Sequence, residues 1–341
     1  MKISSLPSAL LLFLLAAVPA ALHAAPAPET SRIEVFDFFD FRAMSASPSG
    51  ELLRDHIFSD LKRSESTAGL FAAVNAECGT AVPESVARAT VAVFSDPVSG
   101  RVDAAKFEFL GDDAEKFAAL EARSENSRWQ APAVFGLGAG TLSAVPFPRT
   151  FAEKLPSPFA QDSKTVFFHA DRKKKTCTLI ALRAEPDAAA ALADARTAER
   201  TAELLRRADE NGLLIFRKFP RRAHEPAEDG EYSPAVPAGE FSISERDGRT
   251  VVLIEFFCSG AGETAFFERF FRMFRDKLLA GTNVRDEEAR RVLAEIGRAF
   301  SVSSENDVLR IRIDCGAENF PEFLKRREIW CPRRPGDAEK K

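Results

Sequence analysis

Three stretches of the chain share one strand pattern at equal spacing, and this feature constrains the fold more than any other. They are residues 90–96 (TVAVFSD), 165–171 (TVFFHAD) and 240–246 (EFSISER), so their first positions lie 75 residues apart twice. Apolar residues alternate with other residues in each stretch, which is typical of a strand with one buried face. Turn residues and a second apolar run follow each one, so each stretch predicts a β-hairpin.

A helix and a final strand follow each predicted hairpin. The second strands are expected at 105–111, 176–184 and 250–258, the helices near 112–123, 187–208 and 262–280, and the final strands at 141–147, 212–219 and 308–314. The third unit carries an additional helix at 285–299 and an additional strand near 299–302. One such unit cannot bury both faces of its sheet, so neighbouring units must stack or share a sheet. We therefore predict an α+β fold of about three tandem β-β-α-β units, with mainly antiparallel sheets and helices packed on one face.

Two α+β regions are expected along the chain. The N-terminal region, 25–155, contains an alternating strand at 33–41, a helix and the first unit. The C-terminal region, 156–324, contains the second and third units, with a Pro- and Glu-rich linker near 223–238. Residues 325–341 are expected to form a basic flexible tail.

The first residues have the layout of a secretory signal peptide. Lys2 precedes an almost wholly apolar run from Ala9 to Val18, and Ala24 provides a small residue at the cleavage point. We expect residues 1–24 to be removed and the protein to be exported, to the periplasm or beyond the cell. No later stretch approaches ~18 consecutive apolar residues, so no transmembrane span is expected in the exported chain.

Composition argues against some partners. Removal of residues 1–24 takes away Lys2 and no acid, so the charge becomes 46 minus 51, or −5. An acidic exported chain is a poor candidate for nucleic-acid binding. The chain has 30 Phe but only two Trp and one Tyr, which favours core packing over a stacking platform for sugars or bases.

Five cysteines remain after export, at positions 78, 177, 258, 315 and 331. An odd number leaves at least one thiol unpaired, and no C-x-x-C pair supports a redox or zinc site. Cys315 and Cys331 are the candidate disulfide, and buried free thiols are expected elsewhere.

A helix is predicted to begin at Ser47-Pro48-Ser49-Gly50, with Leu53, Ile57 and Leu61 on one face. The order of strand, Ser-Pro-x-Gly helix, hairpin and helix resembles a group of uncharacterised exported bacterial α+β repeat proteins from planctomycete-like lineages. The stretch SASPSGELL carries the resemblance most specifically. The resemblance implies a fold and an exported location, and it implies no activity.

The stretch Ser259-Gly260-Ala261-Gly262 lies between an apparent strand and an apparent helix, as phosphate-binding loops do. It lacks the Lys of a Walker loop and the third glycine of a dinucleotide fingerprint. Acids, including Asp112 and Asp113, occupy the corresponding junction of the first unit, where they suit a helix N-terminus and would repel phosphate. We interpret the stretch as a helix-starting turn and expect no cofactor.

The helix after this turn allows two interpretations. Phe267, Phe270, Phe271 and Phe274 follow helical spacing, and Arg272 lies among them. The favoured reading is a core helix with a solvated basic edge. The alternative is a partner or membrane surface, because a Phe face with Arg flanks suits anionic lipid.

No catalytic or metal-binding residue can be nominated. The exported chain keeps three histidines, which lack metal-ligand spacing, and there is no G-x-S-x-G stretch. Two basic clusters, one of them Arg217, Lys218, Arg221 and Arg222 and the other at 325–334, are candidates for binding an anionic surface.

We therefore expect a non-catalytic binding or scaffolding protein of the periplasm or cell envelope, with an unknown envelope protein or an anionic polymer as its partner. Two alternatives stay open. One is an envelope hydrolase with a site assembled from scattered residues, and the other is a binder of an anionic polymer or lipid surface.

Overall fold

The computed structural model describes residues 33–63, 65–95, 102–111, 113, 115–117, 129–131, 142–146, 165–182, 195–221, 236–280 and 286–321. Outside these residues lie the predicted signal peptide (1–24), the predicted tail (325–341), nearly all of the predicted linker and the predicted boundary between residues 155 and 156.

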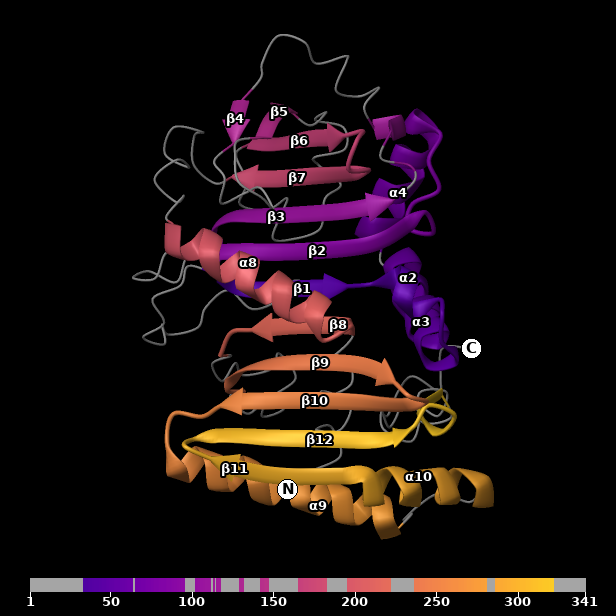
Figure 1. Cartoon of the computed structure of the whole chain (residues 1–341), viewed down its shortest axis with the longest axis vertical. Coiled ribbons are helices and arrows are strands. Elements are labelled where there is room, and N and C mark those ends of the chain that lie inside the picture. Colours follow the sequence, from indigo (N-terminus) through magenta and orange to yellow (C-terminus); the bar gives the residue numbers. More distant parts are fainter. Residues whose placement is uncertain are drawn as a thin grey trace.

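One large sheet organises the described part of the chain (Figure 1). Its twelve strands lie in the order β11-β12-β10-β9-β8-β1-β2-β3-β7-β6-β5-β4, and every neighbouring pair is antiparallel. The strands are β1 (Ile33–Phe39), β2 (Val86–Ser95), β3 (Val102–Gly111), β4 (Trp129–Ala131), β5 (Leu142–Pro146), β6 (Thr165–Asp171), β7 (Thr176–Leu182), β8 (Leu213–Phe219), β9 (Ala238–Arg246), β10 (Arg249–Phe257), β11 (Phe300–Glu305) and β12 (Val308–Gly316). The predicted α+β class with a mainly antiparallel sheet is confirmed.

The three predicted hairpins are present as the antiparallel pairs β2–β3, β6–β7 and β9–β10. Asp247 and Gly248 connect β9 to β10 with φ angles of 51° and 70°. Positive φ at both central residues defines the type I′ turn, whose twist matches that of a two-residue hairpin. The strand that follows each predicted helix has a different kind of partner in each unit. β5 pairs with β6, β8 pairs with both β9 and β1, and β12 pairs with β10.

Helices cover both faces of this sheet, so the prediction of helices on one face is wrong. The helices are α2 (Phe41–Met44), α3 (Pro48–Arg63), α4 (Glu65–Cys78), α8 (Ala195–Glu210), α9 (Ala261–Ala280) and α10 (Glu287–Ala299). Leu204 and Ala208 of α8 pack on one face, in a core cluster with Phe36, Phe38 and Phe216 of the central strands. The other five helices contribute to a second, larger cluster. Figure 1 shows α8 in front of the sheet, and we call the two sides the α8 face and the α9 face.

The central strands explain why both faces need cover. In β1, Phe36 and Phe38 point to the α8 face, whereas Val35 and Phe39 pack in the cluster on the α9 face. Side chains of a strand alternate between its two faces, so a strand that is apolar at consecutive positions must be covered on both. The predicted apolar face of α3 is confirmed, because Leu53 is buried and Ile57 and Leu61 pack against the same core.

The start of α3 fixes that helix against the sheet. The Ser47 hydroxyl accepts a hydrogen bond from the Gly50 amide at 2.9 Å, as an N-terminal capping residue does. Ser49 is fully buried, donates to the Glu245 carboxylate and lies 3.2 Å from the Thr250 hydroxyl. The SASPSG stretch therefore joins the helix to the β9–β10 hairpin.

Gly50 leaves no room for a side chain, because an added Cβ would lie 2.5 Å from the carbonyl oxygen of Met44. We expect Gly50→Ala to lower the free energy of unfolding by roughly 1–3 kcal/mol, the usual effect of overpacking. The matched control is Gly69→Ala in α4, where nothing lies within 4 Å of the added atom and no loss is expected. Urea unfolding followed by circular dichroism measures both, and equal effects at the two positions would rule out the close contact as the cause.

Candidate functional site

Helix α9 begins with a network of hydrogen bonds centred on Glu263. Its carboxylate accepts from both the amide and the hydroxyl of Ser259, at 2.6 and 2.9 Å. Arg221 donates to the same carboxylate through two nitrogens, at 2.7 and 2.8 Å. An acid in the first turn satisfies free amides and complements the helix dipole. The chain's own carboxylate thus occupies the end of the helix where a phosphate would bind, which supports the interpretation of 259–262 as a turn.

The ion pair sets the acid response of this helix. The hydrogen bond from Arg221, together with those from Ser259, lowers the pKa of Glu263 from 4.5 to about 2. Because this pKa is lower in the folded protein than in the unfolded chain, the stabilisation is present above about pH 4.5 and is lost as the pH falls towards 2.

Glu263→Gln is therefore expected to cost about 1.5–3 kcal/mol at pH 7, the usual range for charge-assisted hydrogen bonds. The difference from the wild-type free energy of unfolding should shrink between pH 4.5 and 2. Urea unfolding at pH 7, 4 and 2.5 tests this, and a difference that stays constant across the series would contradict it.

Cys258, next to this turn, has the properties of an inert thiol. It is half-buried, and burial raises its pKa, so the protonated form dominates at neutral pH. The Thr264 hydroxyl lies near it and donates to the carbonyl oxygen of Gly260 at 3.0 Å.

The inner face of α9 is part of the core. Phe267 and Phe271 are 8% and 1% exposed, and both rings stack on Phe256 of β10, with centroids 6.0 and 5.7 Å apart. Half-buried Phe274 contacts Phe300 of β11 at 5.9 Å between centroids, and Phe270 is also half-buried against this core. The predicted partner surface at 267, 270, 271, 272 and 274 is therefore corrected, because its aromatic residues belong wholly or partly to the core. Arg272 is exposed and forms an ion pair with Glu268 at 2.7 Å.

Large apolar side chains of α9 are exposed at other positions. Phe266, Met273 and Leu279 are 59%, 43% and 41% exposed, and among the described residues they are the only large hydrophobic side chains classed as exposed. Phe266 and Met273 are seven residues apart, about two helical turns, so they share one face. Leu279 lies on another side of the helix, because it packs against Gly297 of α10.

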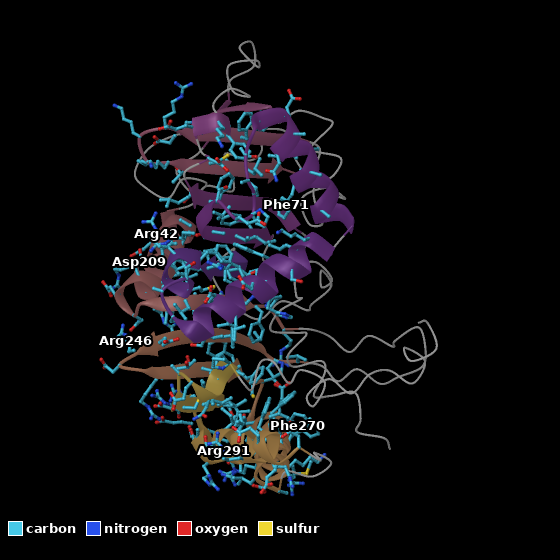
Figure 2. The ribbon with its side chains drawn as sticks, turned by 90° about the vertical axis from the view of Figure 1, so that its right-hand side faces the viewer. Arg42, Phe71, Asp209, Arg246, Phe270 and Arg291 are labelled. Atoms are coloured by element: carbon cyan, nitrogen blue, oxygen red, sulfur yellow. The ribbon has the colours of Figure 1, made fainter. Side chains whose placement is uncertain are left out.

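Two cations lie on the same side as Phe266 and Met273. Arg269 and Lys277 are exposed, and no ion pair is formed by either within the described part of the chain. By contrast, the three acids of α9 are all paired: Glu263 with Arg221, Glu268 with Arg272 and Asp276 with Arg275. We define the outer face of α9 as Phe266, Arg269, Met273 and Lys277. Half-buried Phe270, beside this face, lies on the opposite side of the sheet from Asp209 and Arg246 in Figure 2.

Three of the four residues of the predicted basic cluster at 217–222, those that the structure describes, do not form an anion-binding surface, and the prediction is corrected for them. Arg217 is buried on the α9 face and makes two hydrogen bonds to Asp37, at 2.8 and 3.0 Å. Lys218 is also buried, on the α8 face, and donates to the carbonyl oxygen of Ile33 at 3.2 Å. Arg221 is held by Glu263, and Arg222 lies outside the described residues, as does the second cluster at 325–334.

Only one cysteine of the candidate disulfide lies among the described residues. Cys315 is buried, its Sγ lies 4.0 Å from the carbonyl oxygen of Thr250, and in the thiol form burial raises its pKa to about 11. Cys331 lies outside the described residues, so the pairing stays a prediction.

Two features that would bear on function are absent from the described residues. No group of three or more His, Cys, Asp or Glu residues among them could hold a metal ion. No helix among them combines the length and apolar character that a membrane span requires.

Comparisons with known proteins give weak structural similarities alone. No protein-family model matches the chain, and no curated protein matches it either. Among solved structures, crystal form III of a protein named TP0453 is similar over 89% of this chain and 99% of that one, with a TM-score of 0.40 and 9% identity. Crystal form I of the same protein gives a TM-score of 0.36 and 10% identity over the same shares.

Proposed function

We propose that the chain is a non-catalytic binding protein of the cell envelope, and that the outer face of α9 is its docking surface. The observation that carries the proposal is the exposure of Phe266 and Met273 on one side of a single helix. Exposed apolar side chains that share a surface are typical of interaction sites, because the contact removes them from water. The envelope location is supported by the signal-peptide layout of residues 1–24.

The charges support binding more than catalysis. The largest pKa shifts described above, those of Glu263 and Cys315, arise from a helix-capping ion pair and from burial of a thiol. Both causes are structural, whereas a hydrolase gathers shifted groups in one cleft. The hydrolase alternative would gain support from a titratable cluster that binds substrate. The outer face of α9 offers two cations that are unpaired within the described residues, and the acid beside it, Asp276, is paired with Arg275.

The three-unit organisation belongs to this proposal as well. Three hairpins, two of them followed by the helices α8 and α9, fit a scaffold that grew by repetition of a β-β-α-β unit, in which the third unit acquired α10 and β11. The outer face of α9 would then be a specialisation of that third unit.

The test is binding to isolated envelope membranes. Phe266→Ser combined with Met273→Ser should weaken co-sedimentation with these membranes by roughly tenfold or more, because burial of each side chain favours the bound state. Leu279→Ser is the matched control, since Leu279 is as exposed as Met273 but lies on another side of α9. Wild-type binding by the double variant, or an equal loss in the control, would contradict the proposal.

A further inference from the structure

We infer that the outer face of α9 docks on the surface of an anionic lipid bilayer, with the helix lying along the membrane plane. This inference rests on the proposed function and names the partner of the same site. Three observations carry it: the place of α9 in the molecule, the distribution of its apolar residues and the pairing of its charges.

Helix α9 lies at one end of the molecule. It packs beside β11, the last strand on that side of the sheet, where Glu268 accepts a hydrogen bond from Ser304 at 2.8 Å (Figure 1). Side chains that project from such a helix can enter a fluid surface that has no preformed groove. A bilayer can therefore receive them without a matching shape.

The apolar residues are arranged as in helices that lie in a membrane interface. The inner side, with Phe267 and Phe271, anchors α9 to the core, so the helix is folded before it meets a membrane. The outer side then offers Phe266 and Met273 to the boundary between headgroups and acyl chains. Two such residues give weak binding on their own, so an added electrostatic attraction is required.

The charges supply that attraction and select anionic lipid. All three acids of α9 are paired within the protein, so the free charges on its outer face are the cations Arg269 and Lys277. Each basic residue near an anionic surface strengthens binding by about five-fold, and salt screens this contribution. A neutral bilayer or an uncharged protein groove would leave both cations without partners.

The experiment measures co-sedimentation of the predicted exported form, which lacks residues 1–24, with two kinds of vesicle. One contains phosphatidylcholine alone, and the other contains three parts of phosphatidylglycerol in ten, by mole. We expect the wild type to bind the anionic vesicles at least ten-fold more tightly, and to lose most of this binding in high salt.

Three variants separate the contributions. Phe266→Ser with Met273→Ser should weaken binding to the anionic vesicles by ten-fold or more, and Arg269→Gln with Lys277→Gln by roughly 25-fold. Lys173→Gln with Arg246→Gln removes the same charge from exposed residues elsewhere and should change binding by less than about two-fold.

The outcomes distinguish the two claims. The first decisive outcome combines two results: the Phe266→Ser, Met273→Ser variant loses binding to envelopes, and the wild type binds neither kind of vesicle. That outcome would overturn the lipid inference and leave a protein partner for the same face. Equal binding of the wild type to both vesicles, or an equal loss in the two charge variants, would also overturn it. If the Phe266→Ser, Met273→Ser variant bound both envelopes and vesicles as tightly as the wild type does, the proposed function would be overturned as well.

Discussion

Replacement of Arg217 by Met should lower the free energy of unfolding by about 3–5 kcal/mol. Arg217 and Asp37 lie opposite each other where β8 pairs with β1, and Asp37 is 0% exposed. Their two hydrogen bonds, at 2.8 and 3.0 Å, satisfy both groups in the core. Without Arg217 the Asp37 carboxylate keeps its desolvation cost and loses its partner.

The control is the double variant Asp37→Leu with Arg217→Met. It removes both charges together, so it should recover most of the stability lost in the single variant. Urea unfolding followed by circular dichroism gives both values. If the single and double variants lose equal stability, then packing around Arg217, and not the unpaired carboxylate, is the cause.

A second large effect is expected at Phe271. Phe271→Ala should cost about 3–5 kcal/mol, because the ring is 1% exposed and stacks on Phe256 at 5.7 Å. The same substitution at Phe266, only five residues earlier, should cost less than about 0.5 kcal/mol, since that ring is 59% exposed.

This pair of variants decides which side of α9 faces the core. Thermal or urea unfolding measures both under the same conditions. Equal losses, or a larger loss at Phe266, would mean that the helix is rotated relative to the structure described here, and the outer face would then be assigned to the wrong residues.

Local sequence patterns were sufficient to predict most of the strands. In β10 the buried residues are Thr250, Val252, Ile254 and Phe256, a strict alternation that is visible in the sequence. The hairpin of β9 and β10 followed from the same alternation together with its turn residues, Asp247 and Gly248. Helix α4 was not predicted, because Leu70 and Val74 are the only buried large residues among its described side chains and give too short a periodic pattern.

The order of the strands could not be read from the sequence. The pairing of β1 with β8 joins Asp37 to Arg217, which are 180 residues apart, and no local pattern specifies such a partner. The basic run at 217–222 was predicted to be an anion-binding surface because its distant partners could not be seen in the local sequence. Its residues point to opposite faces of a buried strand, and their partners come from distant parts of the chain.

The sequence predicted the correct helix for the candidate site but assigned the site to the side of α9 that packs on the core. At about 100° per residue the five phenylalanines of α9 occupy one continuous arc of roughly 140°, so helical spacing alone does not show which part of that arc is buried. Phe256 of β10 determines which side of α9 is buried, because its ring stacks on Phe267 and Phe271, whereas Phe266 stays exposed. The signal that could have located the outer face is the second stripe of Phe266, Met273 and Lys277, which follows its own helical spacing.

The central claim is that the outer face of α9 makes the contact, and Phe266→Trp tests it most directly. Tryptophan emission shifts to shorter wavelength when the ring leaves water, so the spectrum of this variant should shift on addition of envelope membranes. Leu279→Trp, on another side of the same helix, should shift much less, and the wild type corrects for Trp129 and Trp330. A clear shift for Phe266→Trp alone is the predicted result. No shift, or equal shifts for the two variants, would contradict the account.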